Sequence, residues 1–378
     1  MKALKAAFFV LLVSTITLSL TGRVLATQWV KDDRNPVLTP TLNGWDAGGV
    51  YLPRVLHSGT TFRMWYLGYG AHLDGPGKIG YAVSSDGASW EKYPTPVLLP
   101  GPQGAWDSYS VSAGSVIRNG TQYSMFYRGL GPLFEFGGVG LATSPNGINW
   151  TKYYANPILT NKSFGVQALD YPYVMRSDSG YQMWCTGQLA GQSPHMIFYA
   201  TSGNGIDWSE RAQPVLTPEL GGWDGFGVYD ATVISDGSRF FMWYSSHPGI
   251  GYAASKDGIT WTKSIDNPIL SRGPVGSWDH FSVGNQAVVI LNDSVLIYYS
   301  AAKALKPDEA KSSIGLARSP QDLLIPEFPL DTVSLLSGVA LLLVSLIFVR
   351  LHSCGRLSAG KGEGRISVES RHIFPRIC

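Results

Sequence analysis

Apolar and aromatic residues occur in short runs along most of this 378-residue chain, and glycine-rich polar turns separate them. The runs FRMWY, YSMFY, YQMWC, FFMWY and VLIYY are rich in aromatic and β-branched residues, as β-strands usually are. The segments HSGT, RNGT and SDGS, together with recurring Asp-Gly and Asn-Gly pairs, supply the positive φ that tight hairpin turns require. The pattern predicts an all-β fold.

The strands recur as a four-part unit. Each unit has an apolar strand after an entry turn, an aromatic strand, an IGYA-like strand, and a final W-x-K/E segment followed by Pro-Val/Ile-Leu. The motif S-x-[DN]-G-x-x-W ends at four tryptophans spaced 60, 58 and 53 residues apart: Trp90, Trp150, Trp208 and Trp261. Four antiparallel strands repeated at this period are typical of a propeller blade. We interpret the motif as a scaffold, a hairpin turn plus a tryptophan that packs into its own blade.

The number of blades follows from the two ends of the repeat. A fifth IGLA segment begins at Ile314, but no tryptophan follows it. The missing part lies near the N-terminus, where Trp29 and Pro36 have the same seven-residue offset as Trp150 and Pro157. We therefore predict a five-bladed β-propeller over residues 28–320, closed by the N-terminal strand, which leaves no free edge between the first and last blades.

Both ends of the chain differ from the repeat. Residues 1–26 start with a lysine, continue as an apolar run and end in Val-Leu-Ala, a pattern typical of a cleaved signal peptide, with an uncleaved anchor as the alternative. After a linker over 321–331, the uncharged stretch 332–349 is long enough for one C-terminal transmembrane helix. The basic tail 350–378 is expected in the cytoplasm. We thus expect a single-pass membrane protein whose propeller lies at the cell surface.

Charge and cysteine content exclude some functions. The signal segment contributes +3 and the tail +4 to a net charge of +2, which leaves about −5 between them. A mildly acidic propeller argues against nucleic-acid binding, which needs a basic surface. Cys185 is the one cysteine between the two ends, so no disulfide is expected there, and its place in an aromatic strand predicts a core residue. No metal-ligand cluster or nucleotide loop is recognisable, and no cofactor is expected.

The topology of a propeller blade restricts where a functional site can lie. In a blade with strands A to D, the D–A and B–C connections lie on one face, here named the loop face. The A–B and C–D turns lie on the opposite face, the turn face. The turns are short and alike, whereas the B–C connections differ between blades. Because binding residues concentrate on variable loops held by a rigid scaffold, we expect an axial pocket at the loop face.

The blades differ in charge along inner strand A. A repeat alignment pairs Tyr51-Leu52, Ser112-Ala113, Asp170-Tyr171, Tyr229-Asp230 and Gly284-Asn285. Asp170 and Asp230 are carboxylates in otherwise neutral columns, and an inner carboxylate is costly to bury unless it is paired or functional. Glu135, in the B–C connection LFEFGG, is a third candidate, with simple solvation as the alternative. The recurring Trp-Asp aspartates are expected to cap turns: Asp46, Asp107, Asp224 and Asp279.

Further residues are expected to line the pocket as ligands for a sugar or an anion. The polar candidates are Arg54, Arg128, Gln167, His72, His195, His247, His280 and Asn285. Three tyrosines are expected to stack on sugar faces: Tyr51, Tyr171 and Tyr229.

The segments NPVLTP, MWYLGYG, IGYAVSSDGASW and NPIL resemble the five-bladed propeller glycosidases, namely glycoside hydrolase families 43 and 32 and the family 130 glycoside phosphorylases. The resemblance implies an axial pocket for the end of an oligo- or polysaccharide and acidic residues from different inner strands. It implies glycoside hydrolysis, or phosphorolysis, with Asp170 and Asp230 as the acid/base pair and Glu135 as a candidate proton donor. LDYP at Leu169 to Pro172 is similar to an Asp-Pro motif of those families.

One feature of blade 1 departs from that resemblance. Tyr51-Leu52 occupies the place where a hydrolase would hold an aspartate, and no inner-strand glutamate matches the usual proton donor. A non-catalytic surface propeller that binds carbohydrate or another protein is therefore the alternative function.

Overall fold

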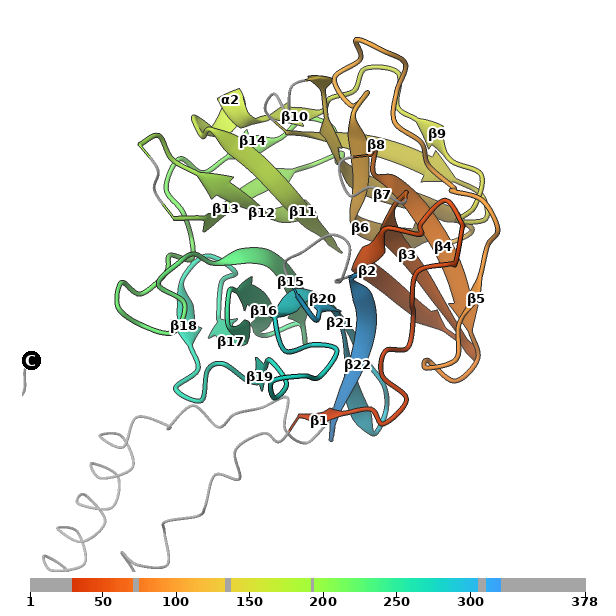
Figure 1. The fold of residues 1–378 in the computed structure, drawn as a ribbon. Helices are drawn as coiled ribbons and strands as arrows, with labels where there is room; N and C mark the ends of the chain where they lie inside the picture. The colour runs from red at the N-terminus through yellow and green to blue at the C-terminus, as the bar shows by residue number, and fades with distance from the viewer. Residues whose placement is uncertain (1–28, 71–74, 133–136, 192–193, 305–310, 321–378) are drawn as a thin grey trace, which may run out of the picture. The chain divides into compact units, whose positions relative to one another are not determined.

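The computed structural model describes residues 29–70, 75–132, 137–191, 194–304 and 311–320. These residues form five antiparallel sheets arranged around a central axis (Figure 1). The predicted all-β, five-bladed propeller is confirmed. The signal-peptide, linker, transmembrane and tail predictions lie outside the described residues, as does Glu135. No helix within the described part of the chain is long and apolar enough to cross a membrane.

The blades use strands of similar length in the same order. Blade 1 contains β2 (Gly49–Ser58), β3 (Thr61–Tyr69), β4 (Lys78–Ser84) and β5 (Glu91–Lys92). Blade 2 contains β6 (Ser110–Asn119), β7 (Gln122–Leu130), β8 (Gly138–Ser144), β9 (Thr151–Lys152) and β10 (Leu159–Thr160). Blade 3 follows the short helix α2 (Asn161–Phe164) and contains β11 (Ala168–Ser177), β12 (Gly180–Gln188), β13 (Met196–Ser202) and β14 (Ser209–Glu210).

Blade 4 contains β15 (Tyr229–Ser235), β16 (Phe240–Ser246), β17 (Gly249–Ser255), β18 (Trp261–Lys263) and β19 (Leu270–Ser271). Blade 5 contains β20 (Ser282–Ile290), β21 (Ser294–Ala302), β22 (Ser313–Pro320) and β1 (Val30–Lys31). The N-terminal strand β1 pairs with β22, so it completes the last blade as predicted. Lys31 also forms an ion pair with Asp279 at 2.6 Å, which ties the closing strand to the start of blade 5.

The hydrophobic core lies between blades rather than within them. Each of the five buried apolar clusters combines residues from two neighbouring blades. The second residue of the MWY run is an aromatic side chain that is fully buried in all five blades: Trp65, Phe126, Trp184, Trp243 and Tyr298. Because each sheet is packed on both sides, the aromatic strands are buried along most of their length.

The S-x-[DN]-G segments are hairpin turns, as predicted. In blade 1 the Asp86 carboxylate accepts N–H bonds from Ala88 at 2.8 Å and Ser89 at 2.7 Å, and the Ser84 hydroxyl accepts one from Gly87 at 2.9 Å. Blades 2 and 3 make the same contacts with an amide in place of the carboxylate, in Asn146 and Asn204.

The tryptophan of each motif packs between its own blade and the preceding one, so the predicted packing into its own blade holds but is only one side of its contacts. Trp150 of blade 2 lies 6.2 Å from Trp65 of blade 1, and the Trp65 indole donates a hydrogen bond to the Gly147 carbonyl at 2.8 Å. Equivalent ring contacts join Trp90 to Tyr298, Trp208 to Phe126 and Trp261 to Trp184. The motif therefore joins consecutive blades on the turn face.

The Trp-Asp aspartates are structural, as predicted. Asp46 is buried, accepts a hydrogen bond from the Tyr66 hydroxyl at 3.2 Å, and forms an ion pair with Lys92 at 2.6 Å. Three other blades repeat this triad, as Asp107–Lys152–Tyr127, Asp224–Lys263–Tyr244 and Asp279–Lys31–Tyr299. Blade 3 lacks all three members, with Gly165, Glu210 and Cys185 in their places. Cys185 is a fully buried core residue, as predicted.

Candidate functional site

Every inner strand carries a β-bulge at the same level of the axis. The pairing of strands A and B shifts register after Tyr51, Ala113, Asp170, Tyr229 and Gly284. Four residues at or next to these shifts have left-handed φ angles of 48° to 52° although they are not glycine: Leu52, Tyr171, Asp230 and Asn285. Bulges and left-handed non-glycine residues are costly and concentrate where side chains must be aimed at a functional site.

Hydroxyl groups from the neighbouring blade hold three of these bulges. The N–H of Asp230 donates to Thr186 Oγ1 at 2.9 Å, that of Asn285 to Ser245 Oγ at 2.7 Å, and that of Leu52 to Ser300 Oγ at 2.9 Å. The three hydroxyls occupy one column of the repeat, directly after the MWY run. The sequence analysis did not identify this column, although the recurrence of Thr or Ser at one position of the repeat in three blades could have indicated it.

In blade 2, a cationic side chain takes the place of the hydroxyl in this column. Arg128 of β7 stands where blades 3, 4 and 5 hold a hydroxyl and blade 1 holds Leu67, and it forms an ion pair with Asp170 of β11. The Arg128 side chain is 24% exposed and that of Asp170 is 13% exposed, so solvent reaches both. Gly137 lies directly against the pair: a Cβ there would come within 2.5 Å of the Leu169 carbonyl oxygen and would touch Asp170 Oδ1 at 3.4 Å and Arg128 Nε at 3.5 Å. Asp170 is thus a carboxylate that is oriented but still accessible.

Tyrosine rings surround this ion pair. The rings of Tyr171 and Tyr229 lie 6.4 Å apart, and Tyr229 lies equally far from the His195 ring. Burial raises the pKa of the Tyr171 hydroxyl, and the Asp170 charge raises it further. Burial and Asp230 raise the pKa of Tyr229 to about 12. Both hydroxyls therefore stay protonated at neutral pH and can donate hydrogen bonds.

Asp230, the second predicted carboxylate, is placed differently. It has no exposed surface, pairs with Arg54 Nη2 at 2.5 Å, and accepts a hydrogen bond from Asn285 Nδ2 at 2.9 Å. Burial raises the pKa of Asp230, while Arg54 and Asn285 oppose that rise. Because its contacts are internal, Asp230 is arranged to hold the half-buried Asn285 amide in place. Its predicted acid/base role stays a prediction.

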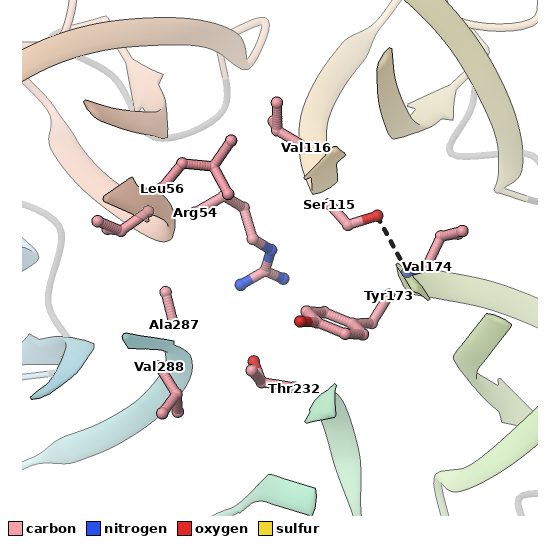
Figure 2. Close-up of a pocket in the computed structure, with 10 residues that line it drawn as sticks. Arg54, Leu56, Ser115, Val116, Tyr173, Val174, Thr232, Ala287 and Val288 are labelled. Carbon is pink, nitrogen blue, oxygen red and sulfur yellow. Dashed lines mark hydrogen bonds between the residues drawn. The ribbon is translucent and has the colours of Figure 1, made fainter. Parts of the chain in front are cut away.

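Arg54 ties several blades together at the axis. Its side chain is 4% exposed and points toward the centre of the propeller, where it faces Tyr173 (Figure 2). Besides Asp230, its guanidinium donates to the carbonyl oxygens of Gly114, Pro53 and Gln286. With these partners satisfied, Arg54 is a structural cross-link in the described structure, and its predicted contact with substrate stays a prediction. The fully buried Gln286 joins the same network and was missed from the sequence.

A small axial cavity of about 50 Å³ adjoins Arg54. Every inner strand contributes lining residues that follow its bulge, among them Leu56, Val116, Tyr173, Thr232 and Val288 (Figure 2). This cavity lies on the turn-face side of the bulges, whereas the expected pocket is on the loop-face side. The loop-face end of the axis is bordered by B–C connections that include segments outside the described residues.

The remaining predicted ligands lie at varied depths. Tyr51 is half-buried, and its ring lies 5.8 Å from that of Tyr69. Gln167 is exposed beside the start of β11, and His247 is exposed in the β16–β17 connection. No group of three or more His, Cys, Asp or Glu residues within the described ranges could hold a metal ion.

Comparison with known proteins places this geometry among carbohydrate-active propellers. The model of the glycosyl hydrolases family 32 N-terminal domain matches residues 55–225, from β2 to the connection before β15. An uncharacterized protein of Mycobacterium tuberculosis is 26% identical over 234 residues, which cover 58% of this chain and 77% of that protein. A 1,2-beta-oligomannan phosphorylase of Thermoanaerobacter sp. is 26% identical over 251 residues, or 61% of this chain and 80% of the phosphorylase.

Solved structures share the fold at lower identity. A glycosyl hydrolase from Bacteroides ovatus has a TM-score of 0.60 at 16% identity and covers 77% of this chain and 93% of its own. A structure from work on the GH130 family, whose glycoside hydrolases target beta-1,2 mannosidic linkages, has a TM-score of 0.59 at 16% identity over 79% and 95% of the two chains. The predicted resemblance to the five-bladed propeller glycosidases is confirmed, and the matches support glycosidase or phosphorylase activity.

Proposed function

We propose that this protein cleaves glycosidic bonds in oligo- or polysaccharides, with Asp170 as its principal acid/base carboxylate. The observation that carries the proposal is the Arg128–Asp170 pair, which replaces a repeated hydroxyl contact with an oriented, partly exposed carboxylate. The family 32 domain match supports the same reaction class. Tyr171 and Tyr229 lie beside the pair and supply hydroxyl donors and ring faces for a sugar.

The number of available carboxylates bears on the reaction type. Hydrolysis by this class of enzyme uses two carboxylates, one to protonate the leaving oxygen and one to activate water or attack the sugar. Asp230 is committed to Arg54 and Asn285, so Glu135 in the β7–β8 connection is our candidate for the second. Phosphorolysis needs only the proton donor, because phosphate is the nucleophile, and a 26% identical relative is a phosphorylase.

A substrate screen with and without phosphate tests the function. The full-length protein is incubated with aryl-glycosides and with oligosaccharides of mannose, xylose, arabinose and fructose. Release of free sugar without phosphate identifies hydrolysis, and release of a sugar phosphate that depends on phosphate identifies phosphorolysis. Binding without turnover in either condition would overturn the enzymatic proposal. It would favour a carbohydrate-binding propeller, the alternative that Tyr51-Leu52 in blade 1 suggests.

We also propose that the propeller acts outside the cytoplasm as a membrane-anchored protein. The signal-like residues 1–26, the uncharged stretch 332–349 and the basic tail 350–378 support this location. Protease added to intact cells is expected to degrade the propeller and spare the tail. Recovery of an intact propeller from intact cells, with degradation only after lysis, would contradict the proposed orientation.

A further inference from the structure

Three aromatic rings lie together on the loop face of blades 4 and 5. Phe226 precedes β15, His247 connects β16 to β17, and Phe281 precedes β20. The centroids of the Phe226 and His247 rings are 6.3 Å apart, and those of His247 and Phe281 are 6.4 Å apart. These three residues are named the aromatic platform below. Phe226 and Phe281 have no role in the axial site described above, whereas His247 is one of its predicted ligands.

Phe226 is unusual because its side chain is almost fully in water. It is 85% exposed and is the one Phe or Trp among the large exposed apolar residues of the described ranges. Its loop is nevertheless held firmly, since the Gly227 N–H bonds to the Asp224 carbonyl at 3.0 Å and Asp224 is bound to Lys263. A rigid, exposed aromatic ring loses little entropy when a ligand binds to it.

The platform continues outward from the axial residues. Tyr229 follows Phe226 by three positions, so their Cα atoms are at most about 11 Å apart. Tyr229 in turn contacts the rings of Tyr171 and His195. The aromatic platform therefore lies one short backbone step from a group of rings that begins at Tyr171, next to Asp170.

We propose that the aromatic platform binds the third and later sugar units of a glycan whose first two units lie at the axis. This rests on the proposed function and names its substrate as an oligosaccharide of three or more units. A pyranose presents an apolar C–H face to an aromatic ring and hydroxyls at its edge, which the His247 nitrogens can reach. Three rings on separate connections suit successive sugars, whereas a protein partner would need a continuous apolar area of several hundred Å².

The test measures affinity as a function of glycan length. Dissociation constants are determined by calorimetry for the full-length protein with Asp170→Asn, so that no substrate is consumed. The probes are mannose, xylose, arabinose and fructose oligosaccharides of two to six units. Without further change, affinity is expected to rise with length. Adding Phe226→Ala is expected to weaken the affinity for the longer oligosaccharides about tenfold and to leave the affinity for disaccharides unchanged.

The control variant is Leu220→Ala, because Leu220 is 83% exposed in the same D–A connection and has no ring partner among the described contacts. It is expected to keep the full dependence on length. A length-dependent gain that survives Phe226→Ala would overturn the platform while leaving the proposed function intact. Absence of binding in every oligosaccharide series would overturn the proposed function, and the platform with it.

Discussion

The aspartates of the Asp–Lys–Tyr triads and those at the axis are all paired with cations, yet they differ in repetition and exposure. Each triad aspartate is at most 4% exposed at its side chain and recurs with its lysine and tyrosine in four blades. Asp170 is 13% exposed, and its Arg128 partner occurs in a single blade. A pairing that recurs with the repeat serves the scaffold, whereas a pairing that interrupts the repeat is open to chemistry where solvent reaches it, as at Asp170 and unlike at the fully buried Asp230.

The largest difference between the triad aspartates and Asp170 is expected in catalysis. Asp170→Asn keeps the shape of the side chain but removes its ability to exchange a proton, so kcat/KM is expected to fall by about 10² to 10⁴-fold. Kinetics on the substrate found in the screen provide the measurement. Asp178→Asn, at an exposed aspartate in the A–B turn of the same blade, is the matched control and is expected to retain activity. Equal activity in the two variants would contradict the role of Asp170.

Breaking a triad is expected to affect stability. Lys92→Met leaves Asp46 buried without its cation, which costs about 3 kcal/mol of unfolding free energy. Glu210→Met changes the same position in blade 3, where no triad exists, and is expected to stay within about 0.5 kcal/mol. Urea unfolding monitored by tryptophan fluorescence compares the two. A similar loss of unfolding free energy in the two variants would show that this position contributes to stability whether or not a buried aspartate lies beside it.

Imposing one triad member on blade 3 is expected to destabilise it. Cys185→Tyr adds a ring to a fully packed site and buries a hydroxyl that has no aspartate to accept its hydrogen bond. The combined cost is about 2 kcal/mol, although four other blades hold tyrosine at this position. Thermal unfolding gives the measurement, with Cys185→Ser as a control for loss of the thiol. An unchanged midpoint for the tyrosine variant would refute the packing argument.

The smallest effect is expected in the pH dependence of the stability that the aspartates of the turn face contribute. Backbone N–H groups of Ser89 and Ala88 hold the pKa of Asp86 below its usual range, and equivalent groups lower that of Asp257 to about 2. Because the folded pKa lies below the unfolded value of about 4, these carboxylates add stability at neutral pH. That contribution is lost as pH falls from about 5 toward 2.

The double variant Asp86→Asn, Asp257→Asn is therefore expected to unfold with a weaker dependence on pH between about 5 and 2. Asparagine already builds the same turn in blades 2 and 3, so the fold is expected to tolerate it. Thermal midpoints measured across this pH range check the slope. A slope equal to that of the unchanged protein would show that other carboxylates dominate acid unfolding.

Much of the fold could be predicted because the repeat is defined by residues that lie close together in the sequence. Turn glycines, aromatic strands and the seven-residue Trp-to-Pro offset each reflect contacts within one blade, including the offset that revealed the closing strand β1. The packing of Trp150 against Trp65 could not be read in the same way, because it depends on how the sheets twist against each other. The alignment of strand A placed Asp170 and Asp230 near the same bulge level, but it could not separate their roles.

The sequence by itself determined the number of blades, their closure and the columns in which the repeat fails, since these depend on residue spacing and strand pairing. Only the tertiary structure decided that Asp230 is sealed beneath Arg54 and Asn285 while Asp170 remains partly exposed beside Arg128. The reason is physical: exposure and ion pairing at the axis depend on side chains from five blades that are far apart in the chain. Those side chains meet only when the ring has closed.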